Sequence, residues 1–311
     1  MDQAFRWLRH VAQVGKRQQE LGYTSPSAEL IEDLKALSSQ SQTYPERWAI
    51  VRKAWSLTHS GQSALAAQEL KKYRLPEANT DPQLEEVQFD FCAGLLQSKA
   101  TLFVDARALL ESVIAQFPNE IGRLAHWYRE HWGRDHLERY FDMLSQYFKE
   151  FGEFSQSLLL RQYGLPIGES EVASSQMFSR TKMFYGNAFE ALMSNVEVLA
   201  CLNNILSGRP FDQFASMDLK KYVTINKGRR AEPFADTPPL AAFAMGVNFA
   251  LRNASHHGAI RLDQGSGMIT YGSDGTAGTK KMRYIEYLAL CSEILLQLAA
   301  LLMFELVLAQ Q

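Results

Sequence analysis

Cysteine is scarce in this sequence, which has only Cys92, Cys201 and Cys291 among its 311 residues. The three lie far apart and form no Cys-x-x-Cys pair or Cys/His cluster. This spacing argues against a disulfide framework and against a zinc site. We expect buried thiols in a reducing compartment, and hence a cytoplasmic protein. The first residues also lack the pattern of a secretory signal peptide, which favours the same location.

Net charge is also small, because 32 lysines and arginines stand against 34 aspartates and glutamates. Such a balance gives the whole chain no electrostatic attraction to nucleic acid or to a membrane surface. A charged partner must therefore bind to a local cluster of opposite charge. The length suffices for one large or two ordinary domains, and a hydrophobic content of 46% is typical of a globular protein.

One apolar run, over residues 288–309, is about as long as a bilayer is thick. Glu293, Gln297 and Glu305 interrupt it, and each of these side chains is costly in hydrocarbon. We therefore expect a core or interface helix here, not a membrane anchor.

Residues 1–125 predict a series of short helices. Apolar residues recur at helical spacing between residues 5 and 37, and Pro45 fits the first turn of a helix that buries Trp48, Val51 and Trp55. Further helices are expected over residues 64–73, 84–96 and 106–117. Their pairing indicates a helix-hairpin module, whose expected role is that of a scaffold or partner-binding platform.

Residues 126–311 predict a second helical domain. Long helices are expected over residues 120–160, 174–206, 238–258 and from 280 to about 308. Alternating residues over 260–262 and 268–271 predict a small β-hairpin before the last helix. The predicted fold class is therefore all-α, with an N-terminal helical module (1–125) and a C-terminal helical domain (126–311).

Three histidines, His126, His131 and His136, recur every five residues in the 120–160 stretch. A step of five residues turns about 140° around a helix, whereas metal ligands on one face need a spacing of three or four. We interpret these residues as partly exposed surface histidines and predict no metal site.

A basic segment precedes the helix predicted over 238–258. Against Asp218 alone, residues 218–230 carry five cations: Lys220, Lys221, Lys227, Arg229 and Arg230. Two interpretations stay open. The segment is either a solvated loop or a contact for the phosphate backbone of RNA, because clustered Lys and Arg release counterions on binding.

The most reactive residue types gather where the helix over 238–258 ends, in the sequence Arg252-Asn253-Ala254-Ser255-His256-His257-Gly258. At about 100° per residue, Arg252 lies above His256 and Asn253 above His257. All four point away from the expected core stripe, which consists of Leu240, Phe243, Ala244, Val247, Leu251 and Ala254.

The outer face of the same helix is also small or apolar, with Ala242, Met245, Gly246 and Phe249. A helix that is apolar on both sides is buried on both sides. We expect the outer face to meet another helix of this chain or a second copy of it.

The chemistry of the four polar residues suits phosphodiester cleavage. Gly258 is a natural residue to end the helix, so the histidines fall in the last turn, where the helix dipole favours a cation. Histidine can act as acid and base near neutral pH, and Arg252 offers a forked donor for phosphate. Asn253 can orient the imidazole of His257 or bind a substrate hydroxyl. Because no acidic cluster is nearby in the sequence, we expect metal-free cleavage by a ribose 2′-hydroxyl, with no cofactor.

The pattern Arg252-Asn253-x-x-x-His257, late in a helix and followed by a glycine, a hairpin and a long apolar helix, resembles the Arg-polar-x-x-x-His motif of the HEPN superfamily. The resemblance covers residues 126–311. It implies a four-helix bundle that dimerises so that two motifs face each other and, in many members, metal-independent RNA cleavage. Arg252 would stabilise the phosphate, His257 would be the general acid/base, and Asn253 would position it.

Two points stay open at this stage. His256 is not part of the family pattern, although helix geometry brings it closer to Arg252 than His257. The Arg…His spacing also occurs at Arg52…His59 and at Arg129…His136.

We predict a homodimeric endoribonuclease that dimerises through the 238–258 helix. Its expected partners are RNA and an antitoxin or other regulatory protein. The alternative is an inactive module of the same fold that binds a nucleotide or a partner protein.

Overall fold

The structure is a computed structural model that describes Arg9 and residues 43–73, 81–169, 171–173, 175, 178–272 and 279–311. The helices predicted between residues 5 and 37 therefore lie outside the described residues, apart from Arg9. Within the described ranges the protein is mostly helical, with one small sheet. The coarse prediction of a helical fold is confirmed.

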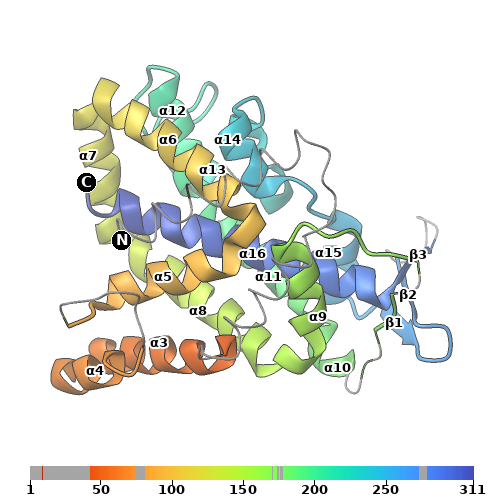
Figure 1. Cartoon of the computed structure of the whole chain (residues 1–311). Coiled ribbons are helices and arrows are strands. Elements are labelled where there is room, and N and C mark those ends of the chain that lie inside the picture. Colours follow the sequence, from red (N-terminus) through yellow and green to blue (C-terminus); the bar gives the residue numbers. More distant parts are fainter. Residues whose placement is uncertain are drawn as a thin grey trace.

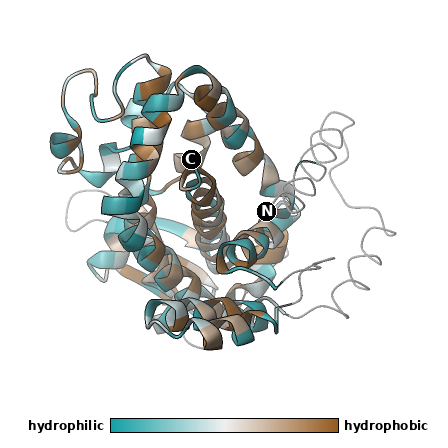
Figure 2. Cartoon of the chain, turned by 90° about the vertical axis from the view of Figure 1, so that its left-hand side faces the viewer, coloured by the Kyte–Doolittle hydropathy of each residue, from teal (hydrophilic) through white to brown (hydrophobic). Residues whose placement is uncertain are grey.

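The fold is built around the last helix, α16 (Tyr284–Leu308), which crosses the middle of the molecule (Figures 1 and 2). Helices α5 (Leu84–Leu96), α9 (Phe151–Gln162) and α11 (Phe184–Asn195) pack against it. By length and composition α16 could span a membrane, but 89% of its most apolar window is buried inside the protein. A helix that is apolar all round and covered by other helices is a core helix, as predicted.

The N-terminal helices share this core. Helix α3 (Tyr44–His59) pairs with α4 (Ser63–Leu70), as the predicted helix hairpin requires. After α5 and the short turn η1 (Gln97–Lys99), α6 (Ala100–Gln116) also packs on α16. One hydrophobic cluster extends from Trp48 to Leu308, so the core is continuous across residue 125, where the sequence predicts a domain boundary.

The predicted helix over 120–160 is divided into pieces. Helix α7 (Pro118–Trp127) passes through one π-helical turn, η2 (Tyr128–Trp132), into α8 (Gly133–Lys149), and α9 follows after Glu150. The prediction of one continuous helix over 174–206 is wrong. Its described part consists of α10 (Phe178–Thr181), α11 and α12 (Glu197–Leu206), with Val196 between the last two.

The segment between α12 and the sheet contains only short elements. They are α13 (Leu219–Tyr222), η3 (Lys227–Arg229), η4 (Glu232–Phe234), α14 (Pro238–Ala241), η5 (Ala242–Ala244) and α15 (Phe249–His256). The prediction of one helix over 238–258 is therefore wrong. Gly246 adopts the left-handed backbone conformation (φ +75°), which ends the first helical piece, and Asn248 begins the second.

The sheet has three antiparallel strands in the order β1 (Ile260–Asp263), β2 (Met268–Tyr271) and β3 (Lys280–Arg283). Ile260 lies opposite Tyr271, and Met268 lies opposite Arg283. The predicted hairpin of β1 and β2 is confirmed. Residues 280–283 were expected to begin the last helix, but they extend the sheet instead, and Arg283 caps α16.

Candidate functional site

Helix α15 is short and is fixed at both ends. The Asn248 side chain accepts a hydrogen bond from the Leu251 amide (3.0 Å), and the Asn248 amide donates to the Tyr185 hydroxyl on α11 (2.6 Å). Such an N-cap stabilises a helix by about 1 kcal/mol. At the other end Gly258 has φ +67° and terminates α15, as predicted. The two anchors set the position of every polar residue between them.

Helix α15 lies very close to α11 at Gly186. A Cβ atom on Gly186 would lie 2.9 Å from Cβ of Ser255 and 3.1 Å from Nε2 of His256. The absence of a side chain at Gly186 is therefore what lets His256 pack against α11.

Replacing Gly186 by alanine is expected to lower the free energy of unfolding by about 1–3 kcal/mol, because the two helices must separate. Gly122, in the middle of α7, is the matched control, since a Cβ there would meet nothing within 4 Å. Gly122→Ala should be neutral or raise stability by about 0.5–1 kcal/mol. Urea unfolding of both variants measures the difference, and equal effects would contradict this packing.

A pocket of about 460 Å³ lies between α11, η3 and α15. It brings together residues that the sequence singled out in two separate segments, Arg252 and Asn253 from α15 and Lys227 from the basic segment. The volume falls in the range of small-ligand sites. Its lining consists of Phe189, Glu190, Asn226, Lys227, Gly228, Phe249, Arg252 and Asn253.

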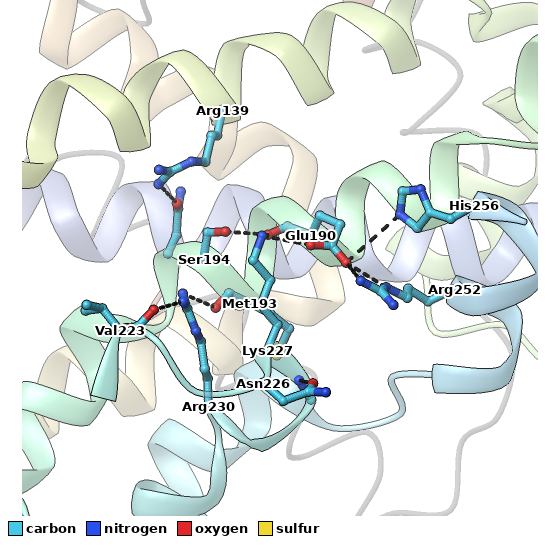
Figure 3. Close-up of polar contacts among 12 residues, drawn as sticks. Arg139, Glu190, Met193, Ser194, Val223, Asn226, Lys227, Arg230, Arg252 and His256 are labelled. Carbon is cyan, nitrogen blue, oxygen red and sulfur yellow. Dashed lines mark hydrogen bonds and ion pairs between the residues drawn. The ribbon is translucent and has the colours of Figure 1, made fainter. Parts of the chain in front are cut away.

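Glu190, on α11, is the centre of the charged contacts in this pocket (Figure 3). It accepts hydrogen bonds from two nitrogens of Arg252, with Nε at 2.6 Å, and pairs with Lys227 at 2.7 Å. Burial raises the pKa of Glu190, but the hydrogen bonds from Lys227 and Arg252 outweigh it, so the pKa lies below the ordinary value. Glu190 is therefore ionised at neutral pH and holds both cations in place.

Arg252 has further contacts in the pocket. Its NH1 donates to the Asn253 side-chain oxygen (2.8 Å), and its guanidinium carbon lies 5.8 Å from the centre of the Phe189 ring. Three of its five N–H groups are thus used, one by Asn253 and two by Glu190, so two remain for a ligand.

The two histidines take different positions. His256 Nε2 lies 4.0 Å from Oε1 of Glu190, which places this ring beside Arg252 (Figure 3). His257 is the exposed C-cap residue of α15, and its imidazole has no hydrogen-bond partner among the residues that the structure describes. The expectation that helix geometry brings His256 closer to the arginine agrees with the shared contact to Glu190.

The basic segment divides into exposed and buried cations. Lys220 and Lys221 are exposed, and Arg229 is exposed and pairs with Glu232 at 2.9 Å. Arg230, in contrast, is buried, with its guanidinium 2.5 Å from Glu197. The prediction that Arg230 contacts RNA is corrected, because no accessible cation remains at this position.

Arg230 instead connects the basic segment to the core. Besides Glu197, its guanidinium donates to the carbonyl oxygens of Met193 and Val223 (Figure 3). Burial raises the pKa of Glu197, and Arg230 opposes this effect. The pair fixes the position of η3, and with it Lys227, relative to α11 and α12.

The prediction of partly exposed surface histidines is correct for His126 and His131, which are exposed, and wrong for His136. His136 is only 1% exposed, and its Nδ1 lies 2.9 Å from Glu305, which is fully buried on α16. The Tyr128 hydroxyl, in the π-helical turn, donates to the second oxygen of Glu305 (3.0 Å). Arg129 instead binds the Ala309 carbonyl, so the Arg129…His136 pattern forms no common site.

Two other kinds of site are a group of metal ligands and a cysteine nucleophile. The described part of the chain contains no group of three or more His, Cys, Asp or Glu residues placed to hold a metal ion. All three cysteines are buried, and burial raises the pKa of each thiol, which disfavours the nucleophilic thiolate.

Sequence reasoning missed Glu190 and Asn226 as members of the site. Glu190 lies 62 residues before Arg252 in a stretch whose apolar pattern only predicts a helix. Asn226 stands next to the basic residues without a pattern of its own.

Comparison of the chain with protein-family models, with curated proteins and with solved structures found no match.

Proposed function

We propose that this protein is a metal-independent endoribonuclease of the HEPN type that works as a homodimer. The observation that carries the proposal is the meeting of Arg252, Asn253 and Lys227 in one pocket, with His257 at the end of the same helix. Cations that stabilise the phosphate and imidazoles that transfer protons are the groups suited to metal-free phosphodiester cleavage.

In the proposed reaction the ribose 2′-oxygen attacks the adjacent phosphorus, and the bond from phosphorus to the 5′-oxygen breaks. His257 takes the proton of the 2′-hydroxyl or delivers a proton to the leaving 5′-oxygen, and in the composite site the partner's copy performs the other transfer. The two remaining N–H groups of Arg252 and the ammonium of Lys227 stabilise the charge on the phosphate oxygens. The products are a 2′,3′-cyclic phosphate and a 5′-hydroxyl.

Lys220, Lys221 and Arg229 are exposed cations of the same basic segment as Lys227. They are suited to hold the flanking phosphates of an RNA strand, because such contacts position a strand without reading its sequence.

Dimerisation is proposed through the surface around α15. Met245 lies in the turn between η5 and α15 and, at 66% exposed, is one of the most exposed large hydrophobic residues of the described chain. Phe249, which lines the pocket, follows four residues later, so a second copy docked at Met245 would lie beside the site.

A charged residue at this surface is expected to separate the dimer. Met245→Glu should raise the dimer dissociation constant at least tenfold and reduce cleavage in parallel, because it buries an unpaired charge. Leu159→Glu, at an exposed leucine of α9, is the matched control and should change neither property. Analytical ultracentrifugation measures the dimer, and a monomeric wild-type protein would contradict the composite site.

The proposal is tested by incubating the purified protein with a labelled single-stranded RNA in excess EDTA. We expect cleavage that EDTA does not reduce.

One observation favours a second candidate function. Because Glu190 pairs with both Arg252 and Lys227 and offsets one of their two positive charges, the same pocket also suits an inactive module that binds a nucleotide or a partner protein. Intact RNA in EDTA, together with retained nucleotide binding, would select this alternative.

A further inference from the structure

Phe249 is an exposed aromatic residue that is nevertheless fixed in position. It is 46% exposed although it lines the pocket. Its ring meets that of Phe189 edge to face, with centroids 5.4 Å apart. A Cβ on Gly228 would lie 3.0 Å from a ring carbon of Phe249, so η3 supports the ring from a second side. An aromatic ring held in this way keeps accessible surface at little cost in conformational entropy.

Two amide side chains accompany the ring. The oxygen of Asn226 accepts a hydrogen bond from the Gly228 amide (2.9 Å), and the oxygen of Asn253 accepts from Arg252 (2.8 Å). With both oxygens engaged, each side chain presents its NH2 group, for which the described residues provide no acceptor. NH2 groups of this kind are donors for the ring nitrogens and carbonyl oxygens at the edges of nucleobases.

Two cations complete the set of ligand-binding groups in the pocket. Lys227 is the immediate neighbour of Gly228, and Arg252 lies three residues after Phe249, so the ring and both positive charges come from the same two elements. Aromatic ring, amide donors and phosphate-binding cations thus share one pocket of about 460 Å³.

We propose that this pocket is a subsite for one unpaired nucleotide, whose base stacks on Phe249 while an adjacent phosphate binds Arg252 and Lys227. Stacking on a protein ring requires a base whose face is free, and this condition is met in loops and single strands but not within a duplex. The subsite therefore restricts the substrate to unpaired RNA. This inference rests on the proposed function for the nature of the ligand, but it does not require cleavage.

The test measures equilibrium binding with strands that cannot be cleaved. The probes are a mixed-sequence decamer with 2′-O-methyl groups throughout, the same decamer as a duplex, and a decamer of abasic 2′-O-methyl residues with equal charge. The wild-type protein should bind the single strand at least tenfold more tightly than the other two probes. Phe249→Leu should weaken binding of the single strand by about 10–100-fold, which corresponds to the usual worth of one stacked base. It should leave the abasic strand unaffected.

Two controls separate stacking from other roles of Phe249. Phe249→Trp should retain single-strand binding, because a larger ring stacks as well. Leu65→Ala, at a similarly exposed residue of α4, should change nothing. The proposal is overturned if Phe249→Leu weakens all three probes equally, or if it dissociates the dimer in ultracentrifugation, because Phe249 would then be an interface residue. Base-dependent binding without cleavage in the EDTA assay would refute the nuclease and leave the subsite standing.

Discussion

Replacement of His257 by alanine is expected to lower the single-turnover rate of RNA cleavage by about 10²–10⁴-fold, the usual contribution of a general acid or base. The His257 imidazole is exposed and, in the described part of the chain, engaged by no other side chain, so it can meet the substrate. Its loss should leave RNA affinity nearly unchanged, because Arg252 and Lys227 remain. Rates at saturating protein, together with the dissociation constant of an uncleavable strand, measure both effects.

His256→Ala is the internal control for this assignment. His256 packs on Gly186 and lies beside Glu190, so we interpret it as a positioning residue whose loss lowers the rate by less than about tenfold. If His256→Ala caused the larger loss and His257→Ala the smaller one, the acid–base role would belong to His256.

Glu305→Leu is expected to lower the free energy of unfolding by about 3–5 kcal/mol, the usual result of removing one partner of a buried pair. The leucine fills a similar volume but leaves the Tyr128 hydroxyl and the His136 Nδ1 without their hydrogen-bond partner. His136 Nε2 already lacks a partner in the described structure, so the ring would be buried with none. Urea unfolding at one fixed protein concentration measures the change.

Glu293→Gln, on the same helix, is the matched control for this prediction. Glu293 pairs with Lys99 at 2.7 Å, but both side chains are partly exposed, so the loss should be below about 1 kcal/mol. A second control is the double variant Glu305→Leu/His136→Phe, which removes both polar groups and should recover part of the loss. Equal effects of Glu305→Leu and Glu293→Gln would contradict the role of the buried cluster.

The sequence predicts much of the helical fold, because burial on one face leaves a periodic pattern. It predicts α16 as a core helix, and it predicts that Leu251 and Ala254 face the core. It fails where one residue changes the backbone. Gly246, with its positive φ, and the N-cap Asn248 divide a pattern that is apolar enough to suggest one continuous helix.

In the candidate site, the sequence predicts contacts between residues that are close in the chain but not contacts between residues that are far apart. Arg252 and His256 are four residues apart, so helical spacing alone places them together, and both lie beside Glu190. Glu190 is 62 residues away and His136 meets Glu305 over 169 residues, and no local pattern encodes either contact.

Two neighbouring residues of the basic segment show most clearly where prediction from the sequence fails. Lys227 and Arg230 are three residues apart and chemically alike. Lys227 nevertheless lines the pocket, whereas Arg230 is buried against Glu197. Arg230 is buried because its acidic partner comes from another helix. The composition of the basic segment does not reveal that partner.

The most direct test of the central claim is the chemistry of the RNA ends after cleavage in EDTA. A strand with one ribonucleotide among deoxynucleotides restricts 2′-hydroxyl attack to a single bond. We predict cleavage at this bond alone, with a 2′,3′-cyclic phosphate on one product and a 5′-hydroxyl on the other, and no cleavage by Arg252→Ala. Products with 5′-phosphates, equal cleavage of an all-deoxy strand, or a strand left intact by the wild-type protein would contradict the account.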